Sequence, residues 1–165
     1  MNVRKFIALA MLAASALISA PASASTGGTP DGELHPNVAL LVSYTAEGRF
    51  RCSGTLVSPS VILTAAHCTD GTLGKVAVTF RSVIAEQPPS GLPVAADPAT
   101  GYTQTQLEGA GYYSGTAHTH PQYSDFTDMA NWNDIGVVVL DQPVTDVAQA
   151  TIADLGTLNT IKRAR

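Results

Sequence analysis

Residues 52–68 read "CSGTLVSPSVILTAAHC": two short apolar runs joined by a Ser-Pro turn, ending in a histidine that directly precedes the second of the chain's two cysteines. The aliphatic and β-branched residues predict two strands, and the Ser-Pro pair predicts the turn between them. Cys68 can tie the end of the second strand back to the first through Cys52, which would hold His67 rigidly. A general base needs such fixed geometry and a pKa near the working pH, which ordinary histidine approaches at about 6.5. His67 is therefore a candidate base, although a single histidine is more often structural.

Short β-favouring runs recur along the rest of the chain. Turn-forming pairs such as Glu47-Gly48 and Asp70-Gly71 separate them, and they lie at residues 38–45, 50–58, 61–66, 76–84 and 135–144. Many short strands with frequent turns predict an all-β sandwich or barrel in a single small domain. Residues 87–113, rich in Pro, Gly, Ala and Thr, fit either a long surface excursion or a weak strand pair around "YTQTQLEG". The sequence leaves both alternatives open.

The amino terminus has the pattern of a secretory signal peptide. Arg4 and Lys5 precede an apolar stretch over residues 6–18, and small residues follow. A helix over these roughly 13 residues would be about 20 Å long, well short of the ~30 Å hydrocarbon core of a bilayer. We therefore expect residues 1–24 to be a signal peptide and not a membrane anchor, and the protein to be secreted into the extracellular space.

The mature chain is acidic. Removal of Arg4 and Lys5 leaves seven of the nine basic residues against thirteen acidic ones, a formal charge of about −6, which argues against a nucleic-acid partner. Three of the seven bases crowd residues 162–165, a basic tail after a domain of residues 25–161. Export to an oxidising compartment favours a Cys52–Cys68 disulfide over free thiols or metal ligands. Closing a loop of about 16 residues contributes about 3 kcal/mol.

A second stretch, "NWNDIGVVVLDQPV", places Asp134 at the head of an almost wholly apolar strand. A carboxylate at the entry to a core is costly unless it is hydrogen-bonded. Two interpretations are open. Asp134 is either a strand-start residue that caps a turn, or an orienting partner that accepts the Nδ1 proton of an imidazole and fixes its tautomer.

The two stretches together resemble the trypsin/chymotrypsin-like serine proteases. The segment "CSGTLVSPSVILTAAHC" is similar to the signature around the family's catalytic histidine, and "HPQYSDFTDMANWNDIGVVVLDQPV" is similar to its His-Pro turn, variable loop and aspartate-bearing strand. The resemblance covers roughly residues 35–160. It implies an all-β fold, a chymotrypsin-like antiparallel Greek-key β-barrel that is the first of the family's usual two.

The resemblance also implies roles for single residues. His67 becomes the general base and later the general acid, and Asp134 becomes its orienting carboxylate. The disulfide between Cys52 and Cys68 supports the turn that carries His67. Two other aspartates, Asp125 and Asp128, are weaker candidates because they lie nearer the variable loop and no apolar strand follows them.

The nucleophile of the family has no counterpart in this sequence. In the family it lies in a Gly-Asp-Ser-Gly-Gly element of a second barrel, and the sequence contains no such element. Ser114, in "YYSGTAHTHP", and Ser53, in "CSGT", are imitations that match first-barrel strands. The family's oxyanion donors, one of which is worth about 3 to 4 kcal/mol, also belong to the second barrel. We therefore expect a truncated serine endopeptidase with the second barrel missing, inactive alone, that would act on a protein or peptide substrate if completed.

Two other functions compete with this one. A non-catalytic secreted pseudoprotease or binding module would use the barrel surface to hold a partner, but it has no need to retain both His67 and Asp134. His118 and His120 can share a strand face, yet two histidines are too few for a zinc site. We expect no metal and no cofactor. A first barrel without its mate would expose apolar surface, which predicts self-association.

Overall fold

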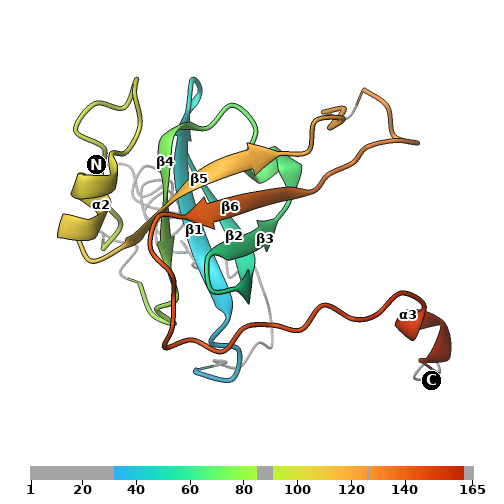
Figure 1. The fold of residues 1–165 in the computed structure, drawn as a ribbon. Coiled ribbons are helices and arrows are strands. Elements are labelled where there is room, and N and C mark those ends of the chain that lie inside the picture. Colours follow the sequence, from blue (N-terminus) through green and yellow to red (C-terminus); the bar gives the residue numbers. More distant parts are fainter. Residues whose placement is uncertain (1–31, 85–90, 126, 162–165) are drawn as a thin grey trace, which may run out of the picture. The chain divides into compact units, whose positions relative to one another are not determined.

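Six strands close into an antiparallel barrel in the computed structural model, which describes residues 32–84, 91–125 and 127–161 (Figure 1). Around the barrel the order of the strands is β1-β2-β3-β6-β5-β4. The strands are β1 (Val38–Thr45), β2 (Gly48–Ser58), β3 (Val61–Thr64), β4 (Leu73–Thr79), β5 (Tyr113–Thr119) and β6 (Gly136–Leu140). The expected all-β class and antiparallel barrel are confirmed. The expected signal peptide at 1–24 and basic tail at 162–165 lie outside the described residues.

Residues 38–68 pair with their neighbours in sequence. β1 and β2 form a hairpin in which Thr45 pairs with Gly48 at the tight end. β2 then turns at the Ser-Pro pair into β3, with Leu56 opposite Ile62. The second apolar run was expected to extend to residue 66, but β3 ends at Thr64 because the chain turns there into a short 3-10 helix, η1 (Ala66–Cys68).

The barrel interior is filled by aliphatic side chains from all six strands. Alternate residues point inward, as the period of a strand requires. The members of this cluster that are fully or almost fully buried include Leu41, Leu56, Ile62, Val76, Val78, Val138 and Leu140. Because the interior is closed and apolar, the barrel wall is a rigid frame, and any chemistry must occur at its ends.

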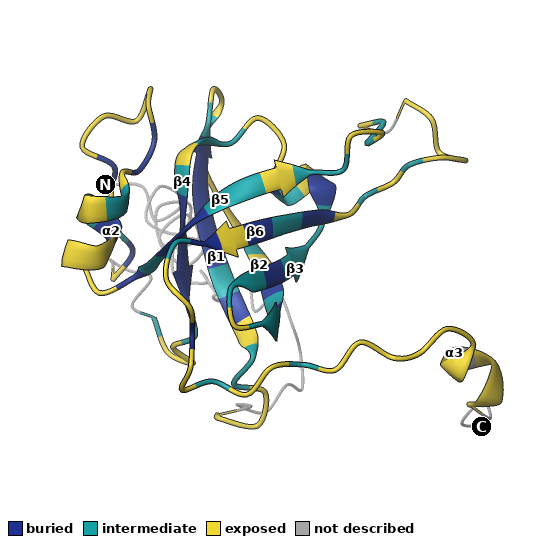
Figure 2. Cartoon of the chain, in the orientation of Figure 1, coloured by how far each residue is buried: buried dark blue, intermediate teal, exposed yellow. Residues whose placement is uncertain are grey.

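A second apolar cluster lies outside the wall, beside β1, most of which is buried (Figure 2). β1 buries Val42 and Tyr44 on its outer face as well as Leu41 within, which explains why its sequence is continuously apolar instead of alternating. Residues 91–112 cover that outer face with Tyr102, Leu107 and other side chains. The ring centroids of Tyr44 and Tyr102 lie 5.0 Å apart, edge to face.

Residues 91–112 differ in part from what their sequence predicts. A weak strand pair around residues 102–109 was one alternative, and it is wrong, because residues 104–109 form a short helix, α2 (Gln104–Gly109). Thr103 caps this helix by accepting a hydrogen bond from the Gln106 amide at 3.3 Å. The other alternative, a surface excursion, describes residues 91–112. β5 was not among the runs singled out as strands, because its outward side is small and polar rather than apolar.

After β6 the chain runs back along the barrel. The amide of Val144 donates to the carbonyl of Pro59 at 2.8 Å, and the amide of Ala150 donates to Leu56 at 2.8 Å. A short helix, α3 (Thr157–Thr160), follows. None of the helices in the described parts of the chain is both long and apolar enough to cross a membrane.

Candidate active site

His67 sits on the turn that follows β3. Two backbone hydrogen bonds close the turn. The amide of Cys68 donates to the carbonyl of Ala65 at 3.2 Å, and the amide of Thr69 donates to the carbonyl of Ala66 at 2.9 Å. Ala66 is fully buried and anchors the turn, whereas the imidazole side chain is half exposed. Cys68 forms the expected disulfide with Cys52 of β2, with Cα atoms 6.0 Å apart. The side chain of His67 therefore projects from a pinned support toward solvent.

Asp134 reaches this turn from the segment that leads into β6, the strand paired with β3. β3 pairs with β6 in a register that sets Thr64 opposite Gly136, so the segment just before β6 lies beside the turn just after β3. One carboxylate oxygen of Asp134 accepts the His67 amide at 2.9 Å, and the other lies 2.9 Å from His67 Nδ1. Of the two sequence interpretations of Asp134, the one that pairs it with an imidazole describes the contact made.

The electrostatics of Asp134 agree with this contact. Burial alone would raise the pKa of the Asp134 carboxyl, but hydrogen bonds from the His67 amide and ring, together with the charge of that ring, hold the pKa below its ordinary value. The carboxylate is thus ionised at neutral pH. An ionised acceptor at Nδ1 favours the tautomer that carries its proton there, which leaves Nε2 free to accept a proton.

The other aspartates named from the sequence lie elsewhere. Asp125 accepts a hydrogen bond from the Tyr123 hydroxyl at 3.2 Å. Asp128 organises its own loop, because it accepts the Ala130 amide at 3.0 Å and the Asn131 side chain at 3.0 Å. Neither is hydrogen-bonded to His67, so the ranking of Asp134 above them agrees with the contacts.

The two serines named from the sequence have other partners. Ser114 is buried on β5 and donates to a carboxylate oxygen of Asp141 at 2.6 Å. The other oxygen of Asp141 accepts from Lys75 at 2.6 Å. Ser53 is exposed on β2, and its carbonyl accepts from Thr64 at 2.8 Å. Within residues 32–84, 91–125 and 127–161, no serine hydroxyl is hydrogen-bonded to the His67 ring.

The histidine pair does not gather metal ligands in the described residues. His118 is exposed on β5, and His120 accepts the Gln122 amide at its ring Nδ1 at 3.2 Å. The one group of three candidate ligand side chains among these residues is Cys52, His67 and Cys68. The two sulfur atoms of that group are joined in the disulfide, so they carry no thiolate for a metal.

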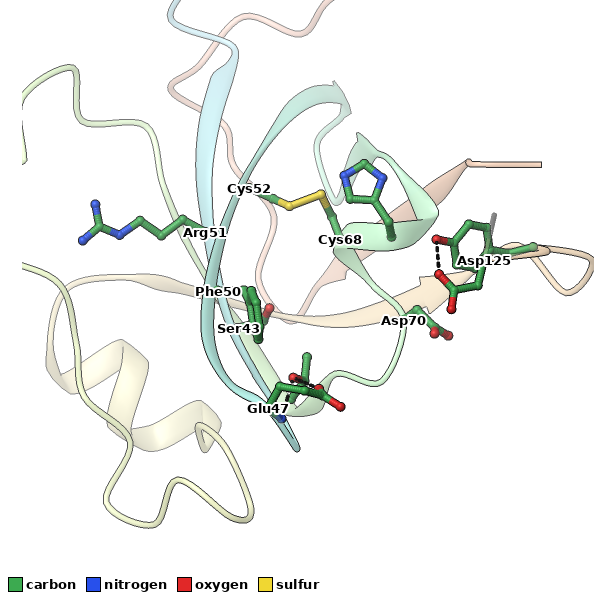
Figure 3. A pocket seen from close by; sticks show the side chains of 11 residues that line it. Ser43, Glu47, Phe50, Arg51, Cys52, Cys68, Asp70 and Asp125 are labelled. Carbon is green, nitrogen blue, oxygen red and sulfur yellow. Dashed lines mark hydrogen bonds between the residues drawn. A yellow bond between two sulfur atoms is a disulfide. The ribbon is translucent and has the colours of Figure 1, made fainter. Parts of the chain in front are cut away.

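A cavity of about 320 Å³ opens beside His67. Its apolar part is formed by Phe50 and the disulfide, and its polar rim carries the carboxylates of Glu47, Asp70 and Asp125 (Figure 3). Arg51 also lines the cavity, but its side chain points away from these three groups (Figure 3). The space next to the imidazole is therefore large enough for an amino-acid side chain, and carboxyl groups line its edge.

Comparison with known proteins decides the family. The family model named Trypsin matches residues 29–163. The chain belongs to the trypsin family. This membership agrees with the resemblance inferred from the sequence, and it covers the whole of the described barrel. A search of curated proteins finds no match.

Three solved structures are similar to this chain. HL collagenase superposes with a TM-score of 0.52 at 19% identity, over 76% of this chain and 46% of that one. GrC gives 0.46 at 20% identity, over 77% and 47%, and the VesB protease of Vibrio cholerae gives 0.46 at 23%, over 84% and 36%. At 19% identity the likeness to HL collagenase is one of fold. The chain spans less than half the length of these structures, which corresponds to a single barrel of the trypsin-family architecture.

Proposed function

We propose that this chain supplies the general base and the orienting carboxylate of a secreted trypsin-family serine endopeptidase. The observation that carries the proposal is the pair of hydrogen bonds between His67 and Asp134, both 2.9 Å long. One bond fixes the backbone of the histidine and the other fixes its ring. Such a doubly held imidazole, half exposed and with no hydrogen bond to Nε2 from the described residues, is the arrangement that general base catalysis requires.

The reaction follows from the roles of these two side chains. Nε2 of His67 accepts the proton of a serine hydroxyl while the serine oxygen bonds to the carbonyl carbon of the substrate. The same nitrogen then gives that proton to the leaving amine as the C–N bond breaks, and a water molecule repeats the sequence to release the acid and restore the serine. Asp134 accepts from Nδ1 throughout and stabilises the imidazolium. In the family the serine and the oxyanion donors belong to a second barrel, and residues 1–165 hold no Gly-Asp-Ser-Gly-Gly element.

The same proposal covers the surroundings of the site. The substrate is a polypeptide, since the cavity beside His67 has room for one of its side chains. A signal peptide at residues 1–24 and the disulfide suit an oxidising extracellular compartment.

We also propose self-association through exposed apolar side chains such as Phe50, Ile135 and Val139, which are between 40% and 54% exposed. Sedimentation of the chain at several concentrations tests this: a monomer throughout would contradict it.

The experiment that tests the catalytic proposal joins these residues to a serine-bearing second barrel. The chain is fused to, or refolded with, the serine-bearing second barrel of a trypsin-family protease, and hydrolysis of peptide amides is measured. We expect no turnover by the chain alone and turnover by the completed protein. His67→Ala should abolish that turnover, and Asp134→Asn should lower it by about 10⁴-fold.

A matched control separates the pair from its neighbourhood. Asp128→Asn changes a carboxylate in the same loop that does not contact His67, and it should leave turnover within about twofold. Turnover that survives His67→Ala would contradict the proposal. A folded, completed protein that binds peptides without cleaving them would instead favour the non-catalytic binding module.

A further inference from the structure

Thr69 is a buried polar residue directly after the turn that carries His67. It is 3% exposed. Its hydroxyl donates to the carbonyl of Ala66 at 2.9 Å and lies 2.9 Å from the hydroxyl of Thr119, which is 50 residues further along the chain. A buried hydroxyl is unfavourable unless its hydrogen bonds are satisfied. The Thr69 side chain therefore joins η1 to the end of β5.

Thr119 has a specific place in the sheet. It is the last residue of β5 and pairs with Gly136, the first residue of β6. Gly136 follows Asp134 by two residues, so the Thr69–Thr119 contact lies over the end of the sheet from which Asp134 projects. A Cβ atom at Gly136 would lie 2.6 Å from the Thr69 hydroxyl oxygen and 2.8 Å from the Ala65 carbonyl oxygen. Only a glycine allows η1 to approach β6 this closely.

The position of η1 is not set by the sheet. The β3–β6 ladder ends at Thr64 opposite Gly136, so the next residues leave the sheet without a strand partner. Two consecutive residues then bind the turn to opposite walls of the barrel. Cys68 ties it to β2 through the disulfide, and Thr69 ties it to β5 through Thr119. Because His67 directly precedes Cys68 and Thr69, these two contacts fix its position relative to β6.

We propose that Thr69 and Thr119 are positioning residues for the His67–Asp134 pair. The hydroxyl contact between them, over the bare Cα of Gly136, holds η1 where the amide and the ring of His67 both reach the Asp134 carboxylate. The significance of this for catalysis rests on the proposed function. The geometric statement does not, because it concerns contacts within this chain.

The test removes one hydroxyl and keeps the shape of the side chain. In Thr69→Val the Ala66 carbonyl still accepts the amides of Thr69 and Asp70, each at 2.9 Å, so the hydrogen bond to Thr119 is the one that is lost without a substitute. We expect the His67 amide to exchange with solvent about fivefold faster, the ratio that one typical hydrogen bond supplies. The ¹⁵N resonance of His67 Nδ1 should move toward that of a tautomer mixture.

Controls separate positioning from general destabilisation. Thr69→Ser restores a hydroxyl and should recover both signals. Thr116→Val removes a hydroxyl from the same strand, one that accepts from Lys75 at 3.0 Å, and should leave the His67 signals unchanged. Amides of the barrel core such as Val78 report global opening and should change far less than the His67 amide in Thr69→Val.

The outcome is decisive in either direction. If Thr69→Val leaves the His67 amide and ring resonances as they are, or changes every amide equally, the proposal is wrong. Should Thr69→Val fail to fold, Thr119→Val probes the same contact from the other strand, with the same expected signals. These readouts need no turnover, so they remain informative if the completed protein proves to be inactive.

Discussion

Nδ1 of His67 lies 2.9 Å from a carboxylate oxygen of Asp134, a residue 67 positions further along the chain. The pairing of β3 with β6 brings the two together, since it sets the end of one strand against the start of the other. The contact is thus made by sheet topology and not by any local turn. It is the feature of this barrel on which the proposed chemistry depends.

Replacement of Asp134 should change how the free energy of unfolding depends on pH in the acid range. The pKa of Asp134 is lower in the folded protein than in the unfolded chain, so its contribution is present above about pH 4 and is lost as the pH falls through the folded value. We expect Asp134→Asn to lower the free energy of unfolding by about 1 kcal/mol at pH 7, because the His67 ring that it contacts is half exposed and solvent screens the interaction. Urea unfolding from pH 2 to 7 should show a shallower acid limb in the variant, and identical limbs would contradict this assignment.

The disulfide should supply a large part of the stability around the site. It closes a loop of 16 residues that contains the β2–β3 turn and His67. We expect the paired substitution Cys52→Ser and Cys68→Ser to lower the free energy of unfolding by about 3 kcal/mol. Denaturant unfolding of the variant against the oxidised wild-type chain measures this, and the reduced wild-type chain is the control for the serine substitutions themselves. A loss below about 0.5 kcal/mol would show that the hydrogen bonds of the turn are sufficient without the bridge.

The ion pair of Lys75 with Asp141 should be structural. Burial alone would raise the pKa of Asp141, but the Lys75 ammonium and the Ser114 hydroxyl outweigh it and hold the pKa below its ordinary value. The resulting stability is present above about pH 4 and is lost on acidification. We expect Lys75→Met to cost about 1 to 2 kcal/mol at pH 7, and to flatten the acid limb of the unfolding curve.

The same variant separates this network from the site. In the completed protein, Lys75→Met should leave the rate of peptide hydrolysis within about twofold, because none of its partners contacts His67. A loss of turnover at unchanged stability would instead assign Ser114 or Asp141 a part in the chemistry.

Ionisation of Tyr102, in the apolar cluster outside the barrel wall, should lower the stability of the fold at alkaline pH. Burial, with a smaller effect of Tyr44, raises the pKa of Tyr102 to about 12. A group whose folded pKa lies above the unfolded value of about 10 stabilises the fold below pH 10, and that contribution is lost as the pH rises toward 12. Tyr102→Phe removes the 2.7 Å hydrogen bond to the Pro93 carbonyl and should cost about 1 kcal/mol at pH 8. Its stability between pH 10 and 12 should fall less steeply than that of the wild type, as measured by unfolding at each pH.

Several features of the fold could be predicted because their causes are local. The runs at 38–45 and 50–58 are apolar and β-branched, and the structure forms strands there. The Ser-Pro turn lies between β2 and β3 as expected. α2 was missed because the burial of Leu107 against the outer wall, and not its own composition, decides its conformation. The composition of β5, which is paired on both sides, did not single it out, and only the family resemblance matched its residues to a first-barrel strand.

By itself the sequence determined the candidates at the site: a histidine before a cysteine at a strand end, and an aspartate at the head of an apolar strand. Those assignments depend on the chemistry of single side chains and on spacing within one motif. Only the tertiary structure decided that one carboxylate binds both the amide and the ring of His67, and that Thr69 meets Thr119 above Gly136. These contacts join residues 50 and 67 positions apart, and their geometry exists only after the barrel has closed and set its strand register.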